Sequence, residues 1–82
     1  MNISVLTPDK EVFSGGITSV KVPGVSGQFQ VLKNHAALVS ALGAGDVTIA
    51  KEDGTKMKFQ IEKGFIEVLR NEISLLVQGL KM

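Results

Sequence analysis

The sequence predicts an all-β domain, an antiparallel sandwich or small barrel built from short strands. Apolar and polar residues alternate with a period of two along most of the chain, and turn signals containing glycine or proline recur about every ten residues. The chain has 82 residues, 44% of them hydrophobic, and shows no internal repeat or linker. We therefore expect residues 1–82 to form a single domain with a small hydrophobic core.

The first half of the chain is expected to contribute four short strands, because proline and glycine separate its apolar runs. The Ser-Gly-Gly at 14–16 is expected to end one strand before the next begins. The run that follows should place Thr18, Val20 and Val22 on one face, since strand side chains alternate. The predicted strands are 3–6, 11–13, 17–22 and 28–32.

The segment from His35 to Leu42 has two possible conformations. It is rich in alanine and leucine and is followed by Gly43, which suits two turns of helix. Eight residues are nevertheless marginal for a helix, and strands are expected on both sides. The pattern alone favours neither a helix nor an extended chain.

A β-hairpin is predicted from the runs 46–51 and 56–62. Met57, Phe59 and Ile61 alternate with polar residues, so this run should have one buried and one wet face. The runs are joined through Asp53-Gly54, which supplies the positive φ angles of a type I′ turn.

The last two predicted strands, 65–69 and 73–77, are apolar on both sides of the alternation. Such runs are typical of strands that are covered on both faces, so we expect both faces of this pair to be buried. Residues 78–82 are expected to form a short frayed tail.

The composition argues against several classes of protein. The net charge is +1 and the nine Lys and Arg residues are scattered, whereas nucleic-acid binders carry a dense basic patch. There is no cysteine for a disulfide or a thiolate metal site. The N-terminus lacks the pattern of a signal peptide, and no apolar stretch approaches the ~20 residues that cross a bilayer. Any membrane association is therefore expected to go through a partner.

No catalytic, cofactor or metal site is expected. His35 is the only histidine, and its sequence neighbours provide no metal-ligand spacing and no nucleophile. Ser26 follows a glycine turn rather than lying in a nucleophile motif. The glycines near 24–27 and 43–45 are too sparse for a phosphate loop and are expected to serve tight turns.

Four segments, taken in order, resemble the epsilon subunit of F-type ATP synthase. Residues 22–38, with a Pro-Gly turn and an Asn-His-Ala segment, resemble the signature stretch of that family. Residues 7–15 resemble its opening, 45–47 its central turn, and 63–68 its Gly-Gly-Phe-x-Glu-Val element. The resemblance covers essentially the whole chain. The departures from the family pattern, which change the polarity of the loop contact, are Gln28, Gln30, Lys33, Ala37 and Lys63.

The resemblance implies a flattened antiparallel β-sandwich of about ten short strands, in which the His35 segment is extended. It also implies a non-catalytic rotor subunit at the foot of the central stalk, bound to the gamma subunit and resting on the ring of c subunits. There the subunit would help couple proton or sodium flow to ATP synthesis. It would be a peripheral membrane protein on the cytoplasmic side of a bacterial inner membrane.

The resemblance also implies two contact sites. The residues that would face the c-ring are Ser26, Gly27, Gln28 and Phe29. The residues that would face the gamma subunit are Thr7, His35 and Ser40. Exposed apolar area is expected where gamma docks.

Members of this family commonly carry a C-terminal helical hairpin that inhibits ATP hydrolysis and in some cases binds ATP. This sequence ends before that hairpin, so the resemblance implies coupling without the inhibitory arm and no nucleotide site. The alternative is a small β-sandwich that binds a ligand such as a sugar. The absence of Trp and Tyr counts against this alternative.

Overall fold

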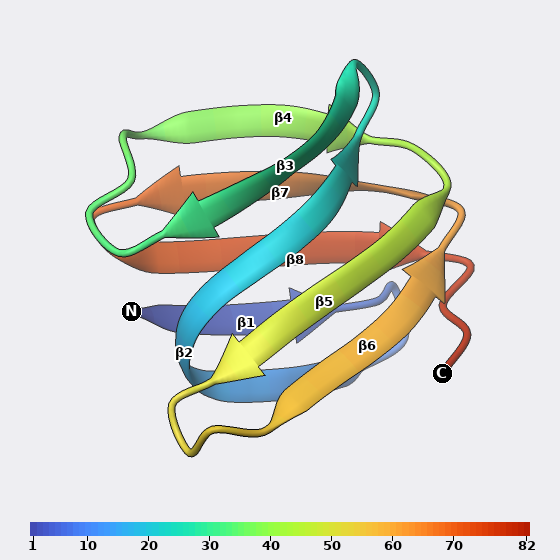
Figure 1. Cartoon of the computed structure of the whole chain (residues 1–82). Helices are drawn as coiled ribbons and strands as arrows, with labels where there is room; N and C mark the ends of the chain where they lie inside the picture. The colour runs from blue at the N-terminus through green and yellow to red at the C-terminus, as the bar shows by residue number, and fades with distance from the viewer.

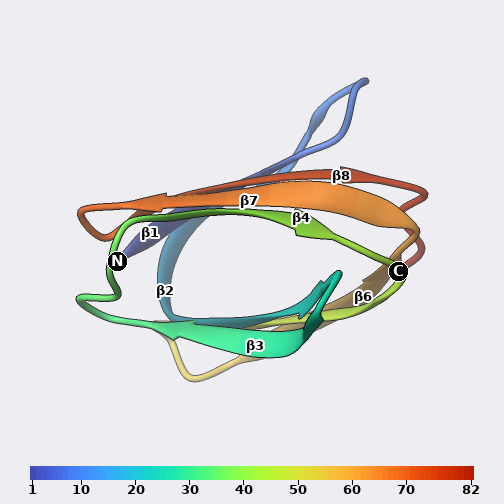
Figure 2. The same cartoon turned by 90° about the horizontal axis from the view of Figure 1, so that it is seen from above.

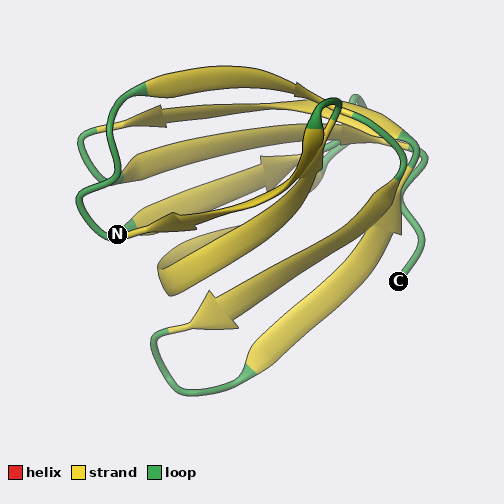
Figure 3. Ribbon diagram, turned by 45° about the horizontal axis from the view of Figure 1, so that its top comes forward, coloured by secondary structure: helices red, strands yellow, loops and turns green.

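The computed structural model describes all 82 residues and consists of strands, turns and loops (Figure 3). It contains no helix long and apolar enough to span a membrane. The strands are β1 (Asn2–Leu6), β2 (Glu11–Gly24), β3 (Gly27–Leu32), β4 (Leu38–Leu42), β5 (Gly45–Lys51), β6 (Lys56–Ile61), β7 (Lys63–Leu69) and β8 (Glu72–Gln78).

The strands form two layers that face each other across a hydrophobic core (Figures 1 and 2). The first layer contains β4, β7, β8 and β1, with the beginning of β2 paired to β1. The second contains β3, the remainder of β2, β5 and β6. A single bridge between Gly24 and Leu42 joins the layers at one side. The predicted all-β sandwich is confirmed.

The number and direction of the strands differ from the prediction. There are eight strands rather than about ten, and β1 and β8 pair in parallel while the other neighbours are antiparallel. The predicted strands 11–13 and 17–22 are one 14-residue strand, β2. The Ser-Gly-Gly at 14–16 does not break the strand, because each of these residues pairs with a residue of β1. The strand instead passes from one layer to the other beyond this point (Figure 2).

The core consists of sixteen buried residues, all hydrophobic, contributed by every strand. Alternation places them on the inner faces, as in β8, where Ile73, Leu75 and Val77 are buried and the intervening residues are exposed. No buried side-chain polar atom lacks a hydrogen-bond partner. Burial of apolar surface, rather than a buried polar network, therefore holds the two layers together.

A bulge in β2 changes one predicted face. Val20 and Val22 are buried as expected, but Thr18 is exposed and Ile17 takes its place in the core. The register with β5 shifts between Ile17 and Ser19, which leaves Thr18 as an extra residue on the β2 side. The Thr18 hydroxyl donates to the carbonyl of Ala50 at 3.3 Å.

The hairpin of β5 and β6 is confirmed, but its predicted turn type is wrong. Only Gly54 in that loop has a positive φ (91°), and the amide of Gly54 donates to the carbonyl of Lys51 at 3.1 Å. This geometry is typical of a type I turn followed by a left-handed glycine. A turn with two positive φ angles joins β7 to β8 instead, at Arg70 (51°) and Asn71 (63°).

Asp53 stabilises the loop of the first hairpin through Thr55. Its carboxylate accepts hydrogen bonds from the hydroxyl of Thr55 at 2.6 Å and from the amide of Thr55 at 2.9 Å. These bonds favour the charged form and lower the pKa of the Asp53 carboxyl below its usual value. The turn is thus closed by its own side chains.

The segment after His35 is extended, as the resemblance implied. Residues 38–42 form β4, which pairs with β7 along its whole length, and residues 35–37 connect it to the turn that follows β3. Pairing with β7 supplies more hydrogen bonds and buried surface than two isolated helical turns could, which explains why the alanine-rich composition does not produce a helix.

The chain end is ordered against the second layer, so the predicted frayed tail is wrong. Gly79 takes a positive φ of 72° and turns the chain towards β6. Gln60 and Lys81 then exchange two backbone hydrogen bonds of 2.8 Å, and Leu80 packs against the core. This strap links the last strand of the first layer to the edge strand of the second.

Candidate docking surface

A row of apolar side chains crosses the outer face of the first layer. Strand pairing aligns Ala41 with Phe65, Phe65 with Leu76, and Leu76 with Leu6. Phe65 is 55% exposed and Leu76 is 50% exposed, although they lie in the middle of the layer. We call these four residues the apolar row. Exposed large side chains next to one another, rather than scattered singly, are typical of a protein docking surface.

The apolar row arises because β7 and β8 are apolar on both faces and only their inner faces meet the core. Ile66 and Val68 point inward and are buried, while Phe65 and Leu69 point outward. The prediction that both faces of this pair are buried is therefore wrong for the domain by itself. The apolar residues on the outer face of β7 and β8 are not covered by any other part of the domain.

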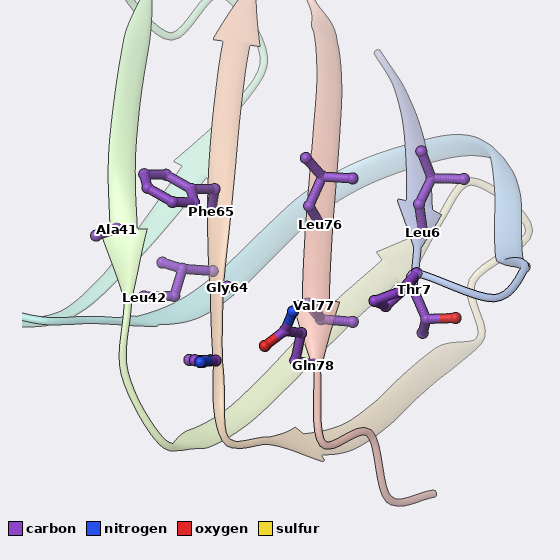
Figure 4. Close-up of a pocket in the computed structure, with 11 residues that line it drawn as sticks. Leu6, Thr7, Ala41, Leu42, Gly64, Phe65, Leu76, Val77 and Gln78 are labelled. Atoms are coloured by element: carbon purple, nitrogen blue, oxygen red, sulfur yellow. The ribbon is translucent and has the colours of Figure 1, made fainter.

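A shallow hollow of about 590 Å³ lies over one end of this face (Figure 4). The apolar row forms much of its lining, and Thr7 and Pro8 bound it from the β1 side. Gly64 and Val77 also line it, and Thr7, Lys63 and Gln78 are its polar members. Its lining is mostly apolar, so it suits a hydrophobic side chain of a partner better than a polar ligand.

Polar rows flank the apolar row on both sides. Lys63 and Gln78 pair on one side. On the other side Glu67 pairs with Ser74, and Ser74 with Ser4, while the exposed Val39 is the apolar member of that row on β4. This arrangement of an apolar centre with a polar margin is common to protein interfaces.

The outer face of the second layer has a different character. The corresponding row there joins Gln30, Lys21, Thr48 and Lys58, all of them polar. An ion pair of 3.5 Å between Lys58 and Asp46 lies on the same layer. Leu32 is the one large apolar residue of β3 exposed there, at 53%. The two outer faces are thus chemically distinct, and the apolar one is the candidate docking surface.

Thr7 is the predicted gamma-facing residue that lies in the hollow. Its hydroxyl donates to the carbonyl of Lys10 at 3.2 Å and accepts from the amides of Asp9 and Lys10. These bonds close the turn between β1 and β2 and place Pro8 at the rim of the hollow. Thr7 therefore shapes the hollow through local bonds.

The other two predicted gamma-facing residues lie outside the hollow. His35 is half-buried between β3 and β4, with Nδ1 2.7 Å from the carbonyl oxygen of Ala36. Ser40 pairs with the buried Ile66, so it points inward from β4, and its hydroxyl donates to the carbonyl of Ala41 at 3.2 Å. The structure thus places Thr7, but not His35 or Ser40, with the apolar row.

The four residues predicted to face the c-ring lie on one hairpin, at the turn between β2 and β3. Gly24 pairs with Gly27, which leaves Val25 and Ser26 as the two-residue tip. Ser26, Gly27 and Gln28 are exposed, and so is Val25 at 67%. Phe29 differs, because it is half-buried and packs partly against the core. Its ring covers Gly24, where an added Cβ would lie 2.8 Å from the ring.

The hairpin tip is attached to the strand that borders the hollow. The amide of Val25 donates to the carbonyl of Ala41 at 3.2 Å, and the amide of Gly43 donates to the carbonyl of Pro23 at 2.8 Å. Ala41 is also a member of the apolar row. The two candidate contact regions therefore meet at the end of β4.

Reasoning from the sequence missed Phe65 and Leu76 as site residues. The available signal was the apolar character of both faces in the last two strands, which indicates either burial within the domain or a covering partner. The sequence pattern cannot distinguish these cases, because it records which residues are apolar but not what covers them.

Comparison with known proteins agrees with this fold. The family model of the ATP synthase delta/epsilon chain β-sandwich domain matches residues 1–81. The ATP synthase epsilon chain of Chlorobium limicola is 45% identical over 93% of this chain and 86% of the relative. That of Protochlamydia amoebophila is 39% identical over 96% of this chain but only 54% of the relative. Relatives of two different lengths therefore share this domain.

Solved structures share the fold at low sequence identity. A chain in the mitochondrial ATP synthase of Euglena gracilis superposes with a TM-score of 0.85 at 18% identity, over 96% of this chain and 51% of that chain. A chain in the central stalk and c-ring of Tetrahymena thermophila mitochondrial ATP synthase gives 0.84 at 18% identity, over 99% and 65%. At this identity the likeness establishes the fold alone. Together with the family model and the curated relatives, it shows that this chain belongs to the ATP synthase delta/epsilon chain family and corresponds to its β-sandwich domain.

Proposed function

We propose that this chain is a non-catalytic rotor subunit of the central stalk in an F-type ATP synthase. It binds the gamma subunit through the outer face of the first layer and contacts the c-ring through the β2–β3 hairpin tip. In this role it helps couple ion flow to ATP synthesis, on the cytoplasmic side of a bacterial inner membrane. It requires no cofactor and no nucleotide, because the role needs matched surfaces rather than a reacting centre.

The observation that supports this proposal most directly is that the apolar row stays exposed although the domain has its own buried core. The core is filled, yet Phe65 and Leu76 remain half exposed beside a hollow. In a chain of this family, the obvious occupant of such a face is the subunit with which it assembles. Thr7 would contribute at the hollow. His35 lies before β4 and Ser40 points inward from it, so any contact of these two with gamma would lie outside the apolar row.

The hairpin tip supports the second half of the proposal. Ser26, Gly27 and Gln28 are exposed together on one tight turn, and Phe29 is anchored beneath them. Uncharged Gln28 can hydrogen-bond a polar loop of the ring, and such a contact is less sensitive to salt than one made by a carboxylate.

The first test is co-purification of this chain with its cognate gamma subunit. A stable 1:1 complex that elutes together in size-exclusion chromatography is the expected result. A folded domain that gives no complex would contradict the proposal and favour a β-sandwich that binds a small ligand such as a sugar.

The hairpin tip has its own test. Gln28→Ala should weaken assembly with the c-ring by about tenfold, because one side-chain hydrogen bond across the contact is lost. Binding to gamma should be nearly unchanged. The reverse pattern, with gamma binding weakened and ring assembly retained, would exclude the proposed position of the tip.

A further inference from the structure

Two asparagines from different layers meet through a reciprocal pair of hydrogen bonds. Asn34 follows β3 in the second layer, and Asn71 lies in the turn between β7 and β8 in the first. The backbone amide of Asn34 donates to Oδ1 of Asn71 at 2.7 Å, and Nδ2 of Asn71 donates to Oδ1 of Asn34 at 3.2 Å. We call these two residues the asparagine pair.

The backbone conformation of both residues suits this pairing. Asn34 has a φ of 66° and Asn71 a φ of 63°, in the left-handed region that asparagine tolerates better than most residues. The carbonyl of Asn71 also accepts a hydrogen bond of 2.9 Å from the amide of Asn2. Three segments therefore converge on Asn71: the beginning of β1, the β7–β8 turn and the turn that follows β3.

The segment after Asn34 has little else to hold it. The amide of His35 donates to the carbonyl of Leu32 at 3.1 Å, and Nδ1 of His35 lies 2.7 Å from the carbonyl oxygen of Ala36. No backbone–backbone hydrogen bond involves Ala36 or Ala37, and both are exposed. Regular pairing resumes at Leu38, where β4 meets β7. The direction in which residues 35–37 leave the turn is thus set next to Asn34.

We infer that the asparagine pair positions the segment 35–37 before assembly, so that the partner meets a preformed rather than a mobile surface. This inference rests on the proposed function, in which His35 belongs to the gamma contact. Ordering a flexible segment on binding weakens affinity, and a preformed segment avoids that loss. Asn34 and Asn71 are therefore positioning residues that act through the backbone beside His35, without touching the partner themselves.

The test uses the variants Asn34→Asp, Asn71→Asp and the double substitution. In either single variant the remaining amide can rotate and donate to the new carboxylate, so the link is kept. In the double variant the side-chain bond between the two residues is lost, and two facing carboxylates repel each other at neutral pH, which opposes the remaining bond from the backbone amide of residue 34. Aspartate, like asparagine, tolerates the left-handed region, so the turns themselves are preserved.

Arg70→Asp provides the matched control. It changes the net charge by the same amount as the double variant, −2 in each case (Arg to Asp, or two neutral Asn to Asp). Arg70 is next to Asn71 in the same turn and also has a positive φ (51°), but its side chain makes no hydrogen bond to Asn34. A general effect of added negative charge would therefore appear in both proteins.

Two readouts separate positioning from stability. We expect the double variant to bind gamma about tenfold more weakly at pH 7, while both single variants and Arg70→Asp stay within about threefold of wild type. In the free domain, NMR order parameters of residues 35–37 should fall in the double variant alone and recover below about pH 4, where the carboxyls become neutral.

The outcomes are distinguishable. If wild type fails to bind gamma, the proposed function fails, and the NMR measurement still decides whether the pair orders the segment. If wild type binds gamma and the double variant matches Arg70→Asp, the inference is wrong. If the double variant does not fold at pH 7, Asn71→Gly replaces it. This variant keeps the turn and removes the link, and it should show the same tenfold loss.

Discussion

Replacing Phe65 with aspartate is expected to abolish detectable binding of the gamma subunit while the domain stays folded. Phe65 lies in the centre of the apolar row, between Ala41 and Leu76. Truncating an aromatic residue at the centre of an interface costs ~2–4 kcal/mol, and burying an unpaired carboxylate there adds to the loss. Affinity should fall by at least about 100-fold, which titration calorimetry or co-purification would detect.

Leu32→Asp is the matched control for this prediction. Leu32 is 53% exposed, close to the 55% of Phe65, but it lies on the polar outer face of the second layer. Both substitutions should change the free energy of unfolding by less than ~1 kcal/mol, because neither side chain is in the core. Equal losses of gamma binding in the two variants would show that the apolar row is not the docking surface.

Gly64→Ala is expected to have the largest effect on folding. A Cβ at Gly64 would lie 2.4 Å from the backbone oxygen of Leu76 and 3.3 Å from Cα of Val77. Because the obstacle is backbone rather than a flexible side chain, β7 and β8 would have to move apart. Overpacking of a fitted site costs ~1–3 kcal/mol, and displaced ladder hydrogen bonds would add to this. We expect a loss of about 3 kcal/mol or more.

The size of the domain makes that loss important. A chain of 82 residues has a total stability of roughly 4–12 kcal/mol at 0.05–0.15 kcal/mol per residue. Urea unfolding of Gly64→Ala should therefore show a much lower midpoint than wild type, or an unfolded protein at 37 °C. Gly43→Ala is the control, because no atom lies within 4 Å of its added Cβ, and it should stay within ~0.5 kcal/mol of wild type. Equal midpoints for the two variants would contradict this account of Gly64.

Local patterns predicted much of the fold. The alternation of Met57, Phe59 and Ile61 correctly placed β6, and its partner β5 follows from the Asp-Gly turn between them. The family resemblance correctly excluded a helix after His35. These features depend on residues that are close in sequence, or on motifs that recur in the family, so they can be read without knowing the tertiary structure.

Features that depend on distant pairing were not predictable in the same way. Thr18 is displaced by a bulge that forms against β5, about thirty residues further along the chain. The continuity of β2 through residues 14–16 depends on pairing with β1, which no local signal indicates. The turn with two positive φ angles falls at Arg70 and Asn71, because the register of β7 and β8 leaves only two residues to connect them.

The candidate site was predicted in part. The resemblance assigned Ser26, Gly27 and Gln28 to one contact site, and the structure places them together at the tip of the β2–β3 hairpin. Thr7 was predicted and lies at the hollow, whereas Phe65 and Leu76, which dominate that surface, were expected to be buried. Composition alone cannot separate an apolar face covered by the domain from one that awaits a partner.

The single long strand β2 has a mechanical consequence for the proposed rotor role. Its beginning pairs with β1 beside the hollow, and its end forms one side of the β2–β3 tip. A force applied at the tip would therefore travel to the opposite layer along an unbroken covalent backbone. Ladder hydrogen bonds to β3 and β5 at one end and to β1 at the other would share the load. Sliding of one layer over the other would require bending that strand, so the domain should respond to torque as one stiff body.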